Sequence, residues 1–105
     1  MLALEATELR VVAQMARGIE PGAAASLFKI RGTEIFQQIT ELIHRAIGNH
    51  GLALREHRAG ANHFMPGPDY GHTASEHYLN SRKLSIYGGS NEIQHNIIAK
   101  AVLGL

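Results

Sequence analysis

The stretch "SIYGGSNEIQHNIIAKAVLGL", residues 85–105, places a Gly-Gly pair and a serine directly before a strongly amphipathic run. Serine is one of the residue types that cap helix N-termini, and Ser90 stands in that place. Apolar residues recur at helical spacing from Ile93 onward, and Glu92 adds a favourable negative charge to the first turn. The stretch therefore predicts a capped helix from Ser90 to the end of the chain.

Two longer helices are expected in the first half of the chain. Apolar residues at three- and four-residue steps predict one over Leu2–Arg17, where a glycine ends it. A proline that suits a helix start opens the second, over residues 21–48. Within it Glu41 and Arg45 stand in the favourable order for an ion pair, and Gly32 costs about 1 kcal/mol against alanine unless close packing requires it.

The second half begins with a stretch of about residues 49–71 that is rich in Gly and Pro and has no sustained period, which predicts a long loop. Thr73 and Glu76 have capping-box spacing and predict a short third helix that runs to about Arg82. The following residues, Lys83–Tyr87, are compatible with an extended segment. No segment is a strong strand candidate.

These patterns predict an all-α fold, an antiparallel helical bundle that forms a single domain over residues 1–105 with the long loop at about 49–71. Helices with one apolar stripe are not stable alone and must pack together. A small bundle also leaves some apolar helix faces uncovered, and these faces are suited to contact with a second subunit or domain.

Composition excludes several function classes. Ten Lys and Arg against nine Asp and Glu give a net charge of +1, which provides no electrostatic footprint for nucleic acid or an anionic membrane. No apolar run has membrane-spanning length, and no signal peptide is apparent. The absence of cysteine removes disulfides, thiol catalysis and thiolate metal ligands, and fits a cytoplasmic protein.

Seven histidines raise the question of a metal site. They are His44, His50, His57, His63, His72, His77 and His95. A zinc site favours two histidines one helical turn apart, and none of these spacings matches that pattern. No metal site is therefore expected, although a histidine metal module is kept as a third hypothesis for the function.

Two glycine-bearing turns are candidate ligand sites. "AIGNHGL", residues 46–52, is typical of a glycine C-cap, and "YGGSNE", residues 87–92, of a capped helix start. The alternative for the second turn is that the amides of Gly88 and Gly89 point at a carbonyl oxygen or a phosphate. Local chemistry leaves both interpretations open.

Taken whole, "IYGGSNEIQHNIIAKAVLGL" resembles the C-terminal part of the acyl-CoA dehydrogenase family. The resemblance continues upstream through "YLNSRKLS", "AIGNHGL" and "SLFKIRGTEIFQQITELIHRAIG", in the family's order and spacing. It implies the family's C-terminal helical domain. Complete members bind FAD and oxidise an acyl-CoA thioester to its 2,3-enoyl form, with one carboxylate removing the α proton and the β hydrogen leaving as hydride to the flavin.

The resemblance also implies roles for the residues of the second turn. The backbone at Gly88 and Gly89 would lie against the thioester, with the Gly88 amide donating to its carbonyl oxygen. Ser90, Asn91 and Glu92 would approach the FAD of the same active site.

The first turn resembles the family's Gln-x-x-Gly-Gly-x-Gly segment, which touches the FAD of a neighbouring subunit. Arg45, Gly48 and Asn49 occupy those positions, with arginine in place of glutamine and asparagine in place of the second glycine. Gly88 stands where many members carry the catalytic glutamate, so no catalytic residue is assigned. In other branches of the family the carboxylate comes from a helix that would precede Met1.

The resemblance thus implies a C-terminal domain that closes the acyl-CoA and FAD site and provides an interface for a homo-oligomer, a dimer or a tetramer. The isolated chain is expected to be inactive and to retain little or no flavin. The alternative from another class is a non-catalytic helical module for oligomerisation or interaction.

Overall fold

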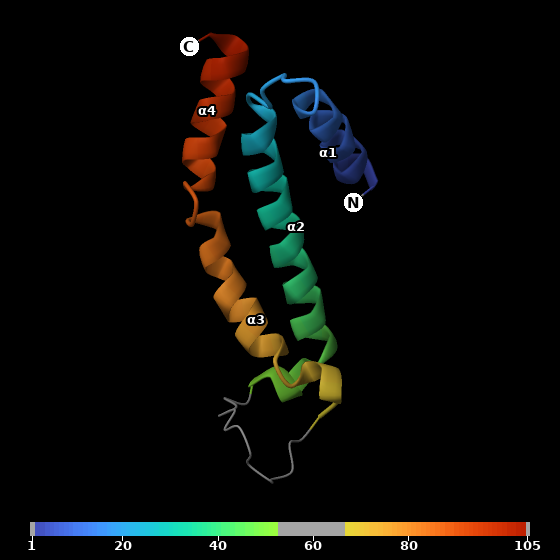
Figure 1. The fold of residues 1–105 in the computed structure, drawn as a ribbon. Coiled ribbons are helices and arrows are strands. Elements are labelled where there is room, and N and C mark those ends of the chain that lie inside the picture. The colour runs from blue at the N-terminus through green and yellow to red at the C-terminus, as the bar shows by residue number, and fades with distance from the viewer. Residues whose placement is uncertain (1, 53–66, 105) are drawn as a thin grey trace. The chain divides into compact units, whose positions relative to one another are not determined.

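The computed structural model describes residues 2–52 and 67–104, and in this part the chain forms helices and turns without a strand (Figure 1). The α-helices are α1 (Leu2–Met15), α2 (Ala24–Ala46), α3 (Ala74–Ser81) and α4 (Asn91–Leu103). Short 3₁₀ helices are η1 (Gly48–Leu52), η2 (Asp69–Gly71) and η3 (Arg82–Ser85). The all-α prediction is confirmed. None of the described helices combines the length and the apolar character needed to cross a membrane.

The chain divides into two compact units, residues 1–35 with 83–105 and residues 36–82. The boundary at residue 35 falls inside α2, so this helix contributes its first half to one unit and its second half to the other. The single domain expected over residues 1–105 stays a prediction. The expected loop over 49–71 lies partly outside the described residues, and its two ends form η1 and η2.

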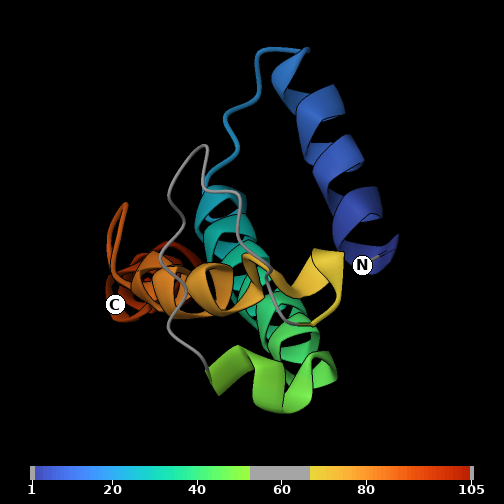
Figure 2. The same cartoon turned by 90° about the horizontal axis from the view of Figure 1, so that it is seen from below.

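The first unit is built from α1, the start of α2, η3 and α4. In it α4 runs in the direction opposite to α2, and α1 is steeply inclined to α2 (Figures 1 and 2). Val11 of α1 and Ile30 of α2 are its buried hydrophobic residues in the described part. Such a thin core gives little hydrophobic stabilisation to the unit by itself.

The second unit joins the latter half of α2 to α3 through polar contacts. Gln37 Nε2 donates to the carbonyl oxygens of Ser81 at 3.1 Å and Arg82 at 3.3 Å. Arg82 Nη2 donates in return to the Gln37 carbonyl at 2.7 Å, and the hydroxyl oxygens of Thr40 and Ser81 lie 3.0 Å apart. Thr40 and Ser81 are buried, so these bonds satisfy polar groups that would otherwise destabilise the unit.

A ring stack continues this contact between α2 and α3. The rings of His44 and Tyr78 lie parallel with centroids 4.7 Å apart, and the Arg82 guanidinium stands 4.6 Å from the Tyr78 centroid. Ser75 Oγ donates to the Gly51 carbonyl at 2.8 Å and lies 3.3 Å from His44 Nδ1. The three elements α2, α3 and η1 are thereby tied together at the end of α2.

The helix ends differ from the sequence expectations by a few residues. α1 ends at Met15 and continues as a turn to residue 18, and α2 begins at Ala24 because a turn follows the proline at 21. The Glu41 and Arg45 ion pair is confirmed, with Arg45 Nη2 and Glu41 Oε1 2.6 Å apart. A Cβ at Gly32 would meet no atom within 4 Å, so close packing does not require that glycine.

Two local predictions are wrong. Thr73 is the N-cap of α3, but its backbone lies at φ −111° and ψ 2° and its side chain makes no capping hydrogen bond, so the capping box with Glu76 does not form. Lys83–Tyr87 is not extended. The Lys83 carbonyl accepts from the amides of Ile86 at 2.9 Å and Tyr87 at 3.1 Å, which closes a helical turn.

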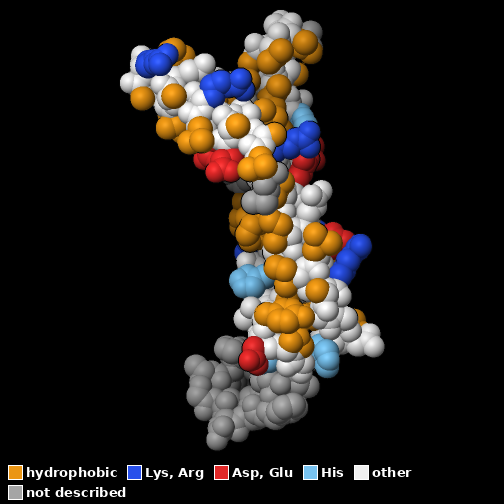
Figure 3. Space-filling model, turned by 90° about the vertical axis from the view of Figure 1, so that its right-hand side faces the viewer, with side chains coloured by type: hydrophobic (Ala, Val, Ile, Leu, Met, Phe, Trp, Pro, Cys, Tyr) orange, Lys and Arg blue, Asp and Glu red, His pale blue; other side chains and the backbone are white. Residues whose placement is uncertain are grey.

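Large apolar side chains remain at the surface of both units, as the orange side chains in Figure 3 illustrate. On the second half of α2 these are Phe36, Ile39, Leu42 and Ile43, and on α4 they include Ile93 and Val102. Large exposed apolar patches are a feature of surfaces that contact other protein.

Candidate functional site

The turn before α4 is the sharpest backbone feature of the first unit. Gly88 has φ +66° and Gly89 φ +85°, both in the left-handed region where residues with a Cβ are strained. Ser90 follows in an extended conformation, φ −63° and ψ 158°, and its hydroxyl oxygen accepts from the Ile93 amide at 3.4 Å. The predicted Ser90 cap is confirmed, and the two glycines provide the reversal that leads into it.

The Gly88 amide of this turn is open. Within the described residues it has no hydrogen-bond acceptor, whereas the Gly88 carbonyl accepts from Gln94 Nε2 at 3.2 Å. A Cβ at Gly88 would meet no atom within 4 Å, so one side of the turn is accessible. A Cβ at Gly89 would stand 2.7 Å from Gln94 Nε2. The hydrogen bond from Gln94 to the Gly88 carbonyl thus holds the turn, and the Gly88 amide stays available to a ligand.

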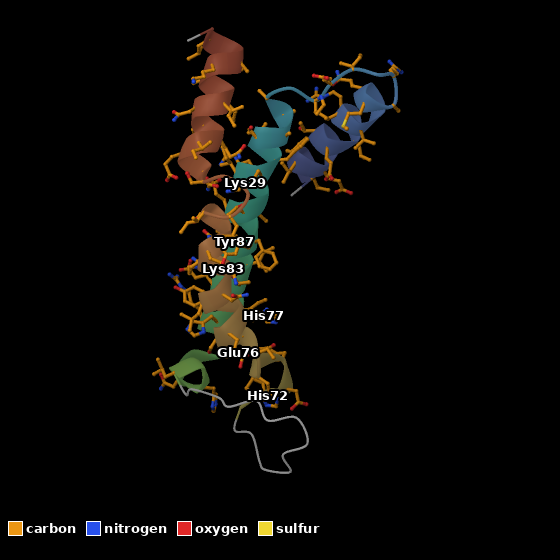
Figure 4. The ribbon with its side chains drawn as sticks, turned by 60° about the vertical axis from the view of Figure 1, so that its left-hand side comes forward. Lys29, His72, Glu76, His77, Lys83 and Tyr87 are labelled. Carbon is orange, nitrogen blue, oxygen red and sulfur yellow. The ribbon has the colours of Figure 1, made fainter. Side chains whose placement is uncertain are left out.

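A lysine that the sequence reading did not single out holds both ends of this turn. Lys29 Nζ, from α2, donates to Asn91 Oδ1 at 2.7 Å and to the Ser85 carbonyl at 3.4 Å (Figure 4). These partners are 62 and 56 residues away in the chain, so no local pattern indicates them. Beside them Lys83 Nζ lies 5.3 Å from the ring centroid of Tyr87.

Glu92 is the residue of the turn whose acidity departs from its ordinary value. The pKa of its carboxyl is lowered, first by the hydrogen bond from its own backbone amide and then by the one from the Ser90 side chain. The positive charges of His95 and Lys29 lower it further. Glu92 therefore stays ionised and can only accept hydrogen bonds.

The other predicted contact residues belong to the second unit. Arg45 lies in the last turn of α2, where its guanidinium is paired with Glu41 and largely exposed. Gly48, at φ +55°, begins η1, and Asn49 follows it at the surface. The structure thus places residues 88–92 together in one unit and residues 45–49 together in the other.

The histidines form no metal centre in the part of the chain that the structure describes, where no three His, Asp or Glu side chains gather as ligands. His57 and His63 lie outside the described residues. His72 Nε2 is buried without a hydrogen-bond partner, and among the described residues it belongs to no group of three potential metal ligands.

Comparison with protein families matches residues 2–103 to "Acyl-CoA dehydrogenase, C-terminal domain". The match covers every described helix. The chain belongs to this family. The acyl-CoA dehydrogenase C-terminal domain is an all-α unit, and the glycine turn before α4 lies within the matched range.

Two curated relatives of this acyl-CoA dehydrogenase domain share a short stretch with it. Acyl-CoA dehydrogenase IpdE1 of Mycolicibacterium smegmatis is 75% identical over 28 residues, which are 27% of this chain and 7% of the relative. Acyl-CoA dehydrogenase IpdE1 of Mycobacterium tuberculosis is 71% identical over 28 residues, with the same coverage of both chains. The matched stretch is thus a small part of the relatives' length. No solved structure matches this chain.

Proposed function

We propose that this chain is the C-terminal helical domain of an FAD-dependent acyl-CoA dehydrogenase, an oxidoreductase that removes hydrogen from the α and β carbons of an acyl-CoA thioester. The family match supports the general activity. The observation that carries the site is the open amide of Gly88, which has no acceptor among the described residues and precedes a capped helix start.

The role of the Gly88 amide follows from the acidity that the reaction requires. A proton next to a thioester carbonyl is removed only if the negative charge that moves onto the carbonyl oxygen is stabilised. A backbone N–H with no acceptor of its own is a pre-organised donor for that oxygen. The missing Cβ at position 88 leaves open space beside this amide, so a thioester can approach the backbone closely.

The side chains of the turn suit a flavin. Ser90 accepts from Ile93 and donates its hydroxyl proton to the Glu92 carboxylate, whereas Asn91 keeps its Nδ2 donors because Lys29 binds its Oδ1. These donors match the carbonyl and phosphate oxygens of FAD. Glu92 accepts only and matches a hydroxyl group. Bound FAD would take the hydride from the β carbon, and this chain would position the thioester against it.

In the second unit, Arg45, Gly48 and Asn49 are proposed to contact the FAD of a neighbouring subunit. The Arg45 guanidinium has to leave or share its partner Glu41 to do so, and its exposure makes that exchange inexpensive because surface ion pairs contribute little. The positive φ of Gly48 opens the backbone there.

The exposed apolar side chains support an interface function. In the second unit, the single chain leaves the side chains of Phe36, Leu42 and Ile43 exposed to solvent. Covering such surface is favourable by about 25 cal/mol per Å². We propose that a homo-oligomer, a dimer or a tetramer, covers these faces, and that the domain closes the acyl-CoA and FAD site in the complete enzyme. Sedimentation of a clean monomer at micromolar concentration would contradict self-association.

No carboxylate of the turn is placed to act as the base, since Gly88 carries no side chain and Glu92 belongs to the first turn of α4. The proposal therefore assigns the base to another part of the enzyme. The chain by itself should show no flavin absorption band and no acyl-CoA-dependent dye reduction.

The decisive experiment mixes this chain with a candidate upstream polypeptide and measures retained flavin absorbance and dye reduction with butyryl-, octanoyl- and palmitoyl-CoA. Recovery of both signals supports the proposal. Retained association without flavin or turnover supports instead the non-catalytic helical module, which the exposed apolar faces also favour.

A matched pair of variants isolates the glycine amide. Gly88→Ala and Gly104→Ala both place a Cβ at a positive φ, +66° and +70°, where it meets no atom within 4 Å. Their cost to folding should be similar. In the assembled enzyme, Gly88→Ala should weaken acyl-CoA binding by about tenfold or more, whereas Gly104→Ala should leave it unchanged. Equal effects would remove Gly88 from the thioester site.

A further inference from the structure

Lys29 bridges the entry and the exit of the glycine turn. Its ammonium group donates to the Ser85 carbonyl before the turn and to Asn91 Oδ1 after it, and the shorter of these bonds is 2.7 Å. All three residues belong to the first unit, and Figure 4 shows Lys29 on α2 beside the start of α4. One side chain therefore spans the segment that carries Gly88 and Gly89.

The remaining ties of the turn are local in sequence. Gln94 Nε2 holds the Gly88 carbonyl, Ser90 caps the Ile93 amide, and the Tyr87 amide bonds to the carbonyl four residues before it. Such bonds define the shape of the turn but not its place relative to α2. The two hydrogen bonds of Lys29 connect the ends of the turn to α2.

The position of this charge is unusual for a purely stabilising contact. A cation near a helix N-terminus opposes the helix dipole, and Lys29 stands at the N-terminus of α4. The two oxygen acceptors compensate the ammonium, and a hydrogen bond with a charged donor is stronger than a neutral one. The result is a positive charge held between the two ends of the glycine turn, which suits an oxygen that becomes negative.

We propose that Lys29 is the positioning residue of the Gly88–Gly89 turn. Acting through Asn91 and Ser85, it holds the open Gly88 amide in register against α2 so that it meets the thioester oxygen of an acyl-CoA. This assignment rests on the proposed function for its substrate, but its structural part is testable without any ligand.

The first test measures amide hydrogen exchange on the full 105-residue chain, under conditions where circular dichroism shows the wild type to be helical. Lys29→Met keeps an unbranched stem and removes the ammonium. It should accelerate exchange at Tyr87 and Gln94 by about tenfold, while the His77 amide of α3, bonded to Thr73, keeps its protection. Lys29→Arg should restore most of the protection because it keeps a charged donor.

Lys100→Met is the matched control, since Lys100 lies exposed in the last turn of α4. It should leave exchange at Tyr87 and Gln94 unchanged. Equal acceleration at all helical amides in Lys29→Met would show a general loss of stability, and no acceleration would show that the turn does not depend on Lys29. Either result overturns the proposal.

A double-mutant cycle tests whether Lys29 acts through Asn91. If it does, Lys29→Met combined with Asn91→Ala should be little worse than Lys29→Met alone, because the second change removes a bond that is already lost. Fully additive effects would contradict the pathway through Asn91. Asn91→Ala alone leaves the Lys29 bond to Ser85 in place, so its effect should be smaller than that of Lys29→Met.

The last arm separates this proposal from the proposed function. In the assembly with the upstream polypeptide, Lys29→Met should raise the Kd for octanoyl-CoA by about tenfold, and Lys29→Arg should restore it. If the wild-type assembly binds no acyl-CoA, the proposed function fails, while the exchange measurements still decide whether Lys29 positions the turn. If acyl-CoA binds equally to wild type and Lys29→Met, the positioning role fails and the function stands.

Discussion

The turn at Gly88 in the first unit and the turn at Gly71 in the second use glycine for different physical reasons. At Gly88 a Cβ would meet nothing within 4 Å, and the backbone needs glycine for its φ of +66°. At Gly71 the φ is not positive, but a Cβ would stand 2.7 Å from Ile47 Cγ2. The space beside Gly88 is therefore open, whereas the space beside Gly71 is occupied by the Ile47 side chain.

The same contrast separates the two candidate contact regions. Gly51, near the end of α2, would place a Cβ 2.7 Å from the His44 ring, so the second unit is closely packed at this point. In the turn before α4, the space beside Gly88 is empty and the Gly88 amide has no acceptor within the described residues. Close packing marks a structural glycine, and an open turn with a free donor marks a candidate ligand site. Substitutions at these positions test the distinction.

The largest effect is expected for Gly71→Ala. The added methyl overlaps Ile47, which is buried at 3% exposure and cannot move without disturbing its neighbours. Overpacking of this kind should lower the free energy of unfolding by about 2 kcal/mol. Urea unfolding followed by circular dichroism measures it.

Gly32→Ala is the control for this change, because its Cβ meets no atom within 4 Å in the middle of α2. It should stabilise the chain by about 1 kcal/mol through helix propensity. Adding Ile47→Leu to Gly71→Ala removes the methyl that is struck, so the pair should cost less than the sum of its members. A fully additive pair would show that contact with Ile47 is not the cause.

A smaller loss is expected for Gly88→Ala, because only backbone conformation opposes it. An alanine at φ +66° should lower the free energy of unfolding by about 1 kcal/mol, and Gly104→Ala at φ +70° should match it. A loss at Gly88 as large as that at Gly71 would mean that the turn is packed after all. Thermal unfolding of both variants in parallel makes the comparison.

A still smaller loss of free energy of unfolding is expected at the helix N-caps. Ser90→Ala removes the bond to the Ile93 amide, which is exposed and 3.4 Å long, so the loss should be about 0.5 kcal/mol. Thr73→Ala is the matched change at the N-cap of α3, where the side chain makes no capping bond. It should leave the free energy of unfolding nearly unchanged. Equal losses at both caps would contradict the difference between these helix starts.

The sequence predicts those parts of the fold that depend on interactions between residues close together in the chain. Apolar periodicity and the Ser90 cap are local, and they predicted the helices correctly. The interpretation of Thr73 failed because capping depends on its backbone conformation, φ −111° and ψ 2°, which spacing does not specify. The segment Lys83–Tyr87 failed because one carbonyl accepts two amides and closes a turn that has no residue signature.

The site shows the same limit more sharply. Gly88 and Gly89 were recognised because a turn of two glycines before a capped helix has a local pattern. Lys29 was not, because a lysine on a helix ordinarily reads as a solvated side chain and its partner Asn91 is 62 residues away. Which glycine is packed and which is open, as at Gly71 and Gly88, also depends on neighbours that only the fold brings close.

The smallest expected effect concerns the charge of Glu92. Its pKa is lowered in the folded chain by its own amide and by Ser90, so its ionised form stabilises the fold above the ordinary pKa of 4.5. That contribution should disappear as the pH falls through the lowered pKa, and Glu92→Gln should make the acid limb of the stability curve less steep. An NMR titration of the Glu92 carboxyl checks the cause directly: Ser90→Ala should raise its pKa, because the hydroxyl no longer donates to the carboxylate. A titration curve unchanged by Ser90→Ala would show that the Ser90 cap and the charge of Glu92 at the start of α4 are independent of each other.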